Sequence, residues 1–125
     1  MNVKKFISPS GDHLFIENFS ISCRVGTTAE ERVHPQKIML CLKVFLDLKR
    51  AGKTDRMEST LNYAEIIDQI RTVTSKGEYQ LVERVAESIA QKILENKKVS
   101  AVEIKVGKKV FQDMDSIGAQ IVRSR

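Results

Sequence analysis

The sequence predicts an α+β domain in which an antiparallel sheet is covered on one face by two antiparallel helices. Two β-like segments come first, two amphipathic helical segments follow, and two shorter β-like segments close the chain. This order, ββααββ, lacks the strand–helix–strand crossover and the glycine-rich fingerprint of dinucleotide-binding folds. It also differs from the βαββαβ order of RNA-recognition domains. A four-stranded antiparallel sheet with both helices on one side is the natural architecture for it.

The first two strands are predicted from residue type and alternation. Segment 13–25 is rich in β-branched and aromatic residues and ends at Gly26. In 37–48 every second residue is aliphatic, so one face collects Ile38, Leu40, Leu42, Val44, Leu46 and Leu48. The polar connection 26–36 contains a proline and predicts a wide antiparallel hairpin between the two strands.

The opposite face of the second strand mixes apolar and charged side chains. Met39, Cys41 and Phe45 alternate there with Lys43 and Asp47. Three apolar side chains would be poorly placed in water, so this face is expected to be buried against another subunit.

The helices are predicted from caps and from apolar residues at helical spacing. After the turn-rich segment 49–55, Asn62 followed by Glu65 predicts a capping box, and 75–79 ends the first helix. The second helix is predicted at 79–94, with an apolar stripe of Leu81, Val82, Val85, Ala86, Ile89, Ala90 and Ile93. Segments 101–106 and 116–122 are then predicted as the last two strands.

Length and composition predict one compact domain. With 125 residues, 42% hydrophobic and 30% charged, the chain can bury a core. Residues 1–12 are expected to be a short polar leader and 13–125 a single domain. Pro9, Gly11 and Asp12 interrupt any apolar region that a signal peptide would need. Because no apolar run is long enough to span a membrane, a cytoplasmic protein is expected.

Charge and cysteine usage give little support to nucleic-acid binding or to a metal site. The net charge of +5 comes from basic residues scattered over 48–53, 96–98 and 105–109, without interleaved aromatic residues. This pattern favours solvated loops over nucleic-acid contact. Cys23 and Cys41 have neither CxxC spacing nor neighbouring histidines, so buried free thiols are expected and a zinc site is not.

Four residues are candidates for chemistry, and each has an ordinary alternative. Glu31 is either part of a solvated charge cluster or a loop carboxylate that binds hydroxyl groups. Tyr63, at a helix start, is either a packing residue or a proton donor and acceptor. Lys108 continues the inward parity of the strand before it, so it is either a surface lysine or a proton shuttle.

Glu83 lies in the first turn of the second helix, where the helix dipole alone favours an acid. A carboxylate there also matches a ligand edge with two parallel N–H groups, as it matches a guanidinium. The 2-amino-4-oxo edge of a pterin or guanine carries that pair of donors.

Four segments in order resemble the dihydroneopterin aldolase family: FIENFSISCRVGTTAEERVHPQKI, AGKTDRMESTLNYAEI, LVERVAESIA and VEIKVGKK. The resemblance runs from His13 to Arg123. It implies the tunnelling fold (T-fold), a four-stranded antiparallel sheet with two helices between its second and third strands. It also implies a homo-tetramer or homo-octamer with active sites between subunits, and a pterin substrate with no metal and no cofactor.

The resemblance also implies roles for the candidate residues. Glu83 and the backbone beside Val82 would anchor the pterin edge, and Glu31 would bind the hydroxyls of the substrate side chain. Lys108 would be the general acid and base near N5. Tyr63, supplied by the adjacent subunit, would handle the proton of the enol intermediate.

The implied reaction is retro-aldol cleavage of 7,8-dihydroneopterin in folate biosynthesis, with possible epimerase activity at C2′. Family members commonly have proline after the lysine, whereas this chain has Lys109. That difference keeps the related dihydroneopterin triphosphate 2′-epimerase as an alternative. A non-catalytic module that binds purines or nucleic acid is a more distant alternative.

Overall fold

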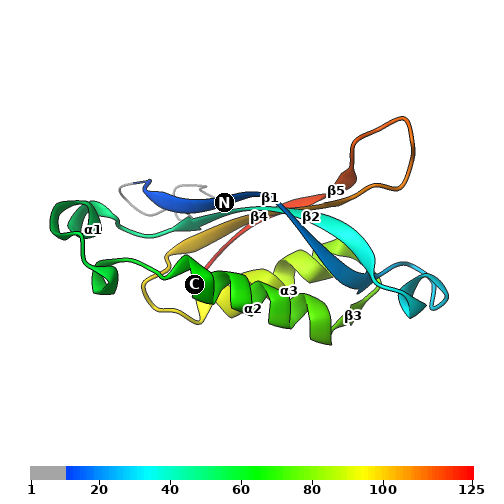
Figure 1. Cartoon of the computed structure of the whole chain (residues 1–125), viewed down its shortest axis with the longest axis horizontal. Coiled ribbons are helices and arrows are strands. Elements are labelled where there is room, and N and C mark those ends of the chain that lie inside the picture. The colour runs from blue at the N-terminus through cyan, green and yellow to red at the C-terminus, as the bar shows by residue number, and fades with distance from the viewer. Residues whose placement is uncertain (1–10) are drawn as a thin grey trace.

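The computed structural model describes residues 11–125 and contains the predicted sheet with two long helices on one of its faces (Figure 1). The strands are β1 (His13–Val25), β2 (Gln36–Phe45), β3 (Glu78–Tyr79), β4 (Ala101–Lys108) and β5 (Ile117–Ser124). The helices are α1 (Lys49–Thr54), α2 (Tyr63–Lys76) and α3 (Val82–Leu94), with 3-10 turns η2 (Glu31–Val33) and η3 (Met57–Ser59). The predicted leader 1–12 lies outside the described residues except for its last two.

The sheet has five strands in the order β3-β1-β2-β4-β5, so the prediction of four strands is wrong by one. β1, β2, β4 and β5 pair antiparallel, as predicted. The added strand, β3, pairs in parallel with Arg24 and Val25 at the end of β1. With two residues it is too short to show any alternation, and its residues fall where the sequence indicates only a helix break. The second long helix therefore begins at Val82 rather than at residue 79.

The core lies between the helices and the sheet face that the alternation in β2 predicts. Ile38, Leu40, Leu42 and Val44 are buried there in one cluster with residues of α3, whose stripe includes the fully buried Val85 and Ile89. Asn62 caps α2 as predicted, with its side-chain oxygen accepting the N–H of Ala64 at 3.0 Å. Cys23 is buried, and desolvation raises the pKa of its thiol to about 11.

Segment 49–55 departs from the predicted turn, because Lys49–Thr54 forms the short helix α1. Its end is set by Asp55, which takes a left-handed conformation (φ 59°) and donates its N–H to the Ala51 carbonyl. Six residues are too few to carry a periodic apolar stripe, which explains why the sequence shows only turn formers there.

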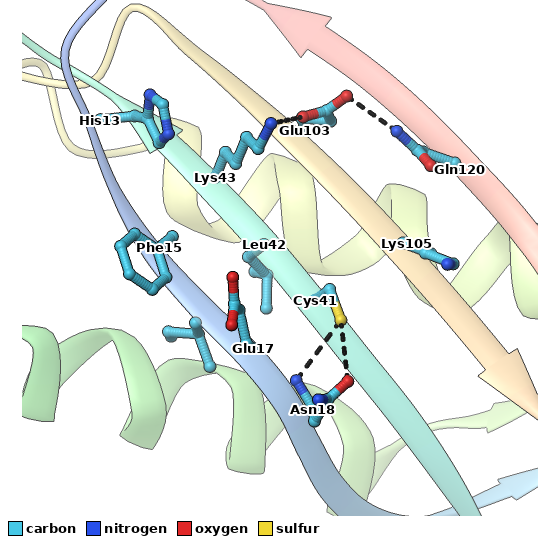
Figure 2. A pocket seen from close by; sticks show the side chains of 11 residues that line it. His13, Phe15, Glu17, Asn18, Cys41, Leu42, Lys43, Glu103, Lys105 and Gln120 are labelled. Carbon is cyan, nitrogen blue, oxygen red and sulfur yellow. Dashed lines mark hydrogen bonds and ion pairs between the residues drawn. The ribbon is translucent and has the colours of Figure 1, made fainter.

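The second sheet face is partly open in the single chain. A hollow of about 470 Å³ lies on it (Figure 2). Its polar groups largely bind one another: Lys43 pairs with Glu103 at 3.5 Å, and Gln120 donates to Glu103 at 2.8 Å. Phe15 and Met39 are exposed at 64% and 41%. The expected burial of this face against another subunit stays a prediction.

Two observations limit other kinds of site within residues 11–125. No helix in that range is long and apolar enough to cross a membrane. Over the same residues, His, Cys, Asp and Glu side chains do not gather in groups of three that could hold a metal ion.

Candidate active site

One end of the sheet brings together the segments that carry three of the four candidate residues. β1 ends there at Val25, β2 begins there, and β4 ends there at Lys108, which pairs with Ile38. The parallel pairing of β3 with β1 brings the chain to the same end just before α3 begins. Glu31, Glu83 and Lys108 therefore belong to segments that meet at this end, which is the right-hand end of the sheet in Figure 1.

Lys108 lies on the helix-covered side of the sheet. In β4 it follows the parity of Val102, Ile104 and Val106, which are fully buried. Its partner across the ladder, Ile38, is also buried. The side chain of Lys108 is itself partly buried at the strand end. This confirms the inward direction that the alternation predicts.

The Glu31 carboxylate lies in the loop between β1 and β2 and is oriented by two hydroxyl groups. Thr27 and Thr28 donate to the same oxygen, Oε1, at 3.1 and 3.3 Å. The hydrogen bond from Thr27 is the main cause of a lowered pKa of the Glu31 carboxyl. The hydrogen bonds from Thr28 and the positive charge of Lys108 lower this pKa further, while desolvation opposes them. Glu31 and Lys108 thus interact electrostatically within one chain.

Glu83 is the second residue of α3 and its side chain is exposed. The residue before the helix, Leu81, forms no side-chain cap. Because the first N–H groups of a helix have no partner within it, the start of α3 offers backbone donors beside the Glu83 carboxylate. The region around Val82 can therefore present donors and acceptors together to a planar polar ligand.

Tyr63 lies at the other end of the sheet. It starts α2, its side chain is 68% exposed, and it borders a hollow of about 440 Å³ that also involves Val44. Val44 pairs with Val102, six residues before Lys108, and at ~3.3 Å per residue this separation is about 20 Å. One chain therefore does not bring Tyr63 to Lys108.

The sequence prediction missed the groups that hold Glu31. The only sequence feature that points to them is the position of Thr27 and Thr28, four and three residues before Glu31, from which a hydroxyl can reach its carboxylate in a turn. The neighbouring Arg32 is also not a solvated loop charge, because its side chain is only 14% exposed and pairs with Glu78 at 2.9 Å. No spacing rule connects residues 32 and 78 before the β1–β3 pairing is known.

Comparison with known proteins decides the family. Residues 14–122 match the family model described as dihydroneopterin aldolase, which is most of the chain. The chain belongs to the dihydroneopterin aldolase family. The resemblance stated from the four sequence segments is thereby confirmed, and this membership supports dihydroneopterin aldolase as the function.

Individual dihydroneopterin aldolases match over most of their length. Dihydroneopterin aldolase 1 of Arabidopsis thaliana is 31% identical over 92% of this chain and 82% of its own. The Haemophilus influenzae dihydroneopterin aldolase is 30% identical over 90% of this chain and 96% of its own. The crystal structure of the Escherichia coli enzyme in complex with neopterin superposes with a TM-score of 0.85 at 29% identity, covering 90% of this chain and 99% of that one. The predicted T-fold is therefore confirmed, with the fifth strand as the correction.

Proposed function

We propose that this dihydroneopterin aldolase family member cleaves 7,8-dihydroneopterin into 6-hydroxymethyl-7,8-dihydropterin and glycolaldehyde, a step of folate biosynthesis. The observation that carries the proposal is that the segments bearing Glu31, Glu83 and Lys108 lie at the same end of the sheet, where the charge of Lys108 lowers the pKa of Glu31. A neopterin ligand in the related E. coli enzyme supports a pterin as the substrate class. Glu83 accepts hydrogen bonds from the pterin amino group and N3–H, and backbone groups beside Val82 complete the contact.

The chemistry uses the ring of the substrate as the electron acceptor. The 2′-hydroxyl loses its proton and becomes a carbonyl, the C1′–C2′ bond breaks, and the electron pair moves through C6 to N5. Lys108 gives N5 a proton at this step and takes it back when C1′ is protonated. Because the C6=N5 imine already accepts the electrons, the reaction needs neither a metal ion nor a Schiff base on the protein.

Glu31 binds the hydroxyl groups of the substrate side chain, and its lowered pKa keeps it an acceptor. Tyr63 handles the proton at C1′ of the enol intermediate and comes from a second copy of the chain. Its origin in a second copy is supported by the separation of about 20 Å along β4 between Val102, whose partner Val44 shares a hollow with Tyr63, and Lys108. A homo-tetramer or homo-octamer with sites between subunits meets this requirement. Recombination of the cleaved fragments would give epimerisation at C2′ as a side reaction.

Product analysis tests the reaction itself. Purified protein incubated with dihydroneopterin is expected to release glycolaldehyde and hydroxymethyldihydropterin in equal amounts, measured by chromatography. A folded oligomer that releases no glycolaldehyde would contradict the proposal. Conversion to the C2′ epimer without cleavage would instead favour the epimerase reaction.

The triphosphate epimerase is the second candidate because Lys109 follows Lys108 directly and is exposed just beyond β4. An exposed lysine beside the site could bind a substrate phosphate, where a proline could not. A strong preference for dihydroneopterin triphosphate, abolished by Lys109→Pro, would favour this reaction. Equal or better turnover of the unphosphorylated substrate would favour the aldolase.

A further inference from the structure

The loop that carries Glu31 holds this carboxylate by one oxygen only. Oε1 accepts from the hydroxyls of both Thr27 and Thr28, and each carboxylate oxygen has about two acceptor positions. Thr28 Oγ1 also accepts the backbone N–H of Glu31 at 3.1 Å, which fixes the start of the side chain. Oε1 is therefore fully used within the protein, and Oε2 is the oxygen left for a ligand.

Gly26 makes room for this arrangement. A Cβ atom at position 26 would lie 2.5 Å from Cβ of Glu31 and 3.2 Å from its Oε2. Contacts as short as the first do not occur in folded proteins, so any other residue would displace Glu31. Gly26 is itself held, because its N–H donates to the Tyr79 carbonyl of β3 at 3.0 Å.

Two arginines fix the rest of the loop. Arg32 donates to the Gly26 carbonyl at 2.8 Å and pairs with Glu78 of β3 at 2.9 Å. Arg24 donates to the Val33 carbonyl at 2.6 Å. These contacts tie the position of the Glu31 loop to β3, which directly precedes α3, the helix that carries Glu83.

We propose that Thr27 and Thr28 are positioning residues, which hold Oε1 of Glu31 so that Oε2 faces the side-chain hydroxyls of the substrate. The proposal rests on the proposed function, because it assigns the threonines a role in that reaction. Without the Thr27 hydroxyl, the carboxylate loses one of two restraints and can rotate. Removing the strongest hydrogen bond also raises the pKa of Glu31 towards its ordinary value, so the protonated form persists to higher pH.

The test compares Thr27→Val, which removes the hydroxyl at nearly constant shape, with Thr27→Ser, which keeps it. Thr27→Val is expected to lower kcat/KM for dihydroneopterin by about tenfold, and to move the acidic limb of its pH profile upward. Thr27→Ser should restore both. Thr54→Val is the matched control, because its hydroxyl donates to the Arg50 carbonyl in α1, at the far end of β2 from the Glu31 loop.

A readout independent of turnover separates this proposal from the proposed function. In carbon-detected NMR titrations the pKa of Glu31 should be below the ordinary glutamate value in the parent protein, and higher in Thr27→Val. Parent-like kinetics and an unchanged Glu31 titration in Thr27→Val would overturn the positioning role while the aldolase function stands. No cleavage by the parent protein would overturn the proposed function, and with it the positioning role of the threonines in that reaction.

Discussion

Replacing Lys108 with alanine is expected to lower kcat for dihydroneopterin cleavage by about 10²–10⁴-fold, the usual contribution of a general acid and base. The structure gives the physical reason. Lys108 is on the helix-covered side of β4, partly buried, and close enough to Glu31 to affect its pKa. Substrate affinity should change much less, because the proposed anchor of the pterin edge is Glu83 and not Lys108. Single-turnover kinetics together with equilibrium binding of neopterin would separate the two effects.

Lys105→Ala is the matched control for this prediction. Lys105 lies in the same strand with the opposite parity, and it borders the hollow on the other sheet face (Figure 2). Its removal should leave kcat near the parent value. Equal losses in both variants would point to a general effect of positive charge, and a fully active Lys108→Ala protein would remove Lys108 from the mechanism.

Replacing Glu83 with alanine is expected to weaken neopterin binding by about 100-fold or more. Hydrogen bonds to a charged group contribute about 1.5–3 kcal/mol each, and a carboxylate facing two parallel N–H groups makes two of them. The fold should persist, because Glu83 is exposed at the second position of α3 and contributes nothing to the apolar stripe. Isothermal titration calorimetry with neopterin, alongside circular dichroism, measures both.

Glu87 provides the control one helical turn later. It accepts from Arg123 of β5 at 3.0 Å and from Gln91 at 3.2 Å, and these hydrogen bonds lower the pKa of its carboxyl. Glu87→Ala should therefore cost a little stability and leave neopterin affinity unchanged. If both variants lost affinity alike, the assignment of Glu83 as the pterin anchor would fail.

These two acids also show what the sequence could and could not predict. From periodicity alone Glu83 and Glu87 are similar acids beside one apolar stripe. The partner of Glu87, Arg123, is far along the chain, in the last strand. Only the packing of α3 against β5 reveals that Glu87 joins the two elements.

The larger elements were predictable because their patterns are long. The alternation in β2 and the stripe of α3 each extend over ten or more residues. Both match the buried faces found, except at the start of the predicted stripe, where Leu81 is exposed and Val82 only partly buried. β3 was missed because it consists of Glu78 and Tyr79 alone, and α1 because six residues show no period.

The candidate site, like the fold, could be predicted from the sequence only in part. The inward direction of Lys108 follows from strand parity, and the family resemblance added the roles of Glu31, Glu83 and Tyr63. The hydrogen bonds from Thr27 and Thr28 to Glu31 depend on the conformation of the loop, and a loop leaves no periodic pattern in the sequence. The separation of Tyr63 from Lys108 required the β2–β4 register.

The most direct test of a site shared between two copies of the chain is whether two inactive variants restore each other's activity. Lys108→Ala and Tyr63→Phe are each expected to lose formation of hydroxymethyldihydropterin, because each lacks one half of the proposed shared site. When equal amounts are unfolded together and reassembled, about a quarter of the sites should combine an intact Lys108 with an intact Tyr63 from a neighbouring copy. Recovery of about that fraction of parent activity is the result we expect. Mixed oligomers that remain as inactive as their parents would contradict a site completed by a second copy.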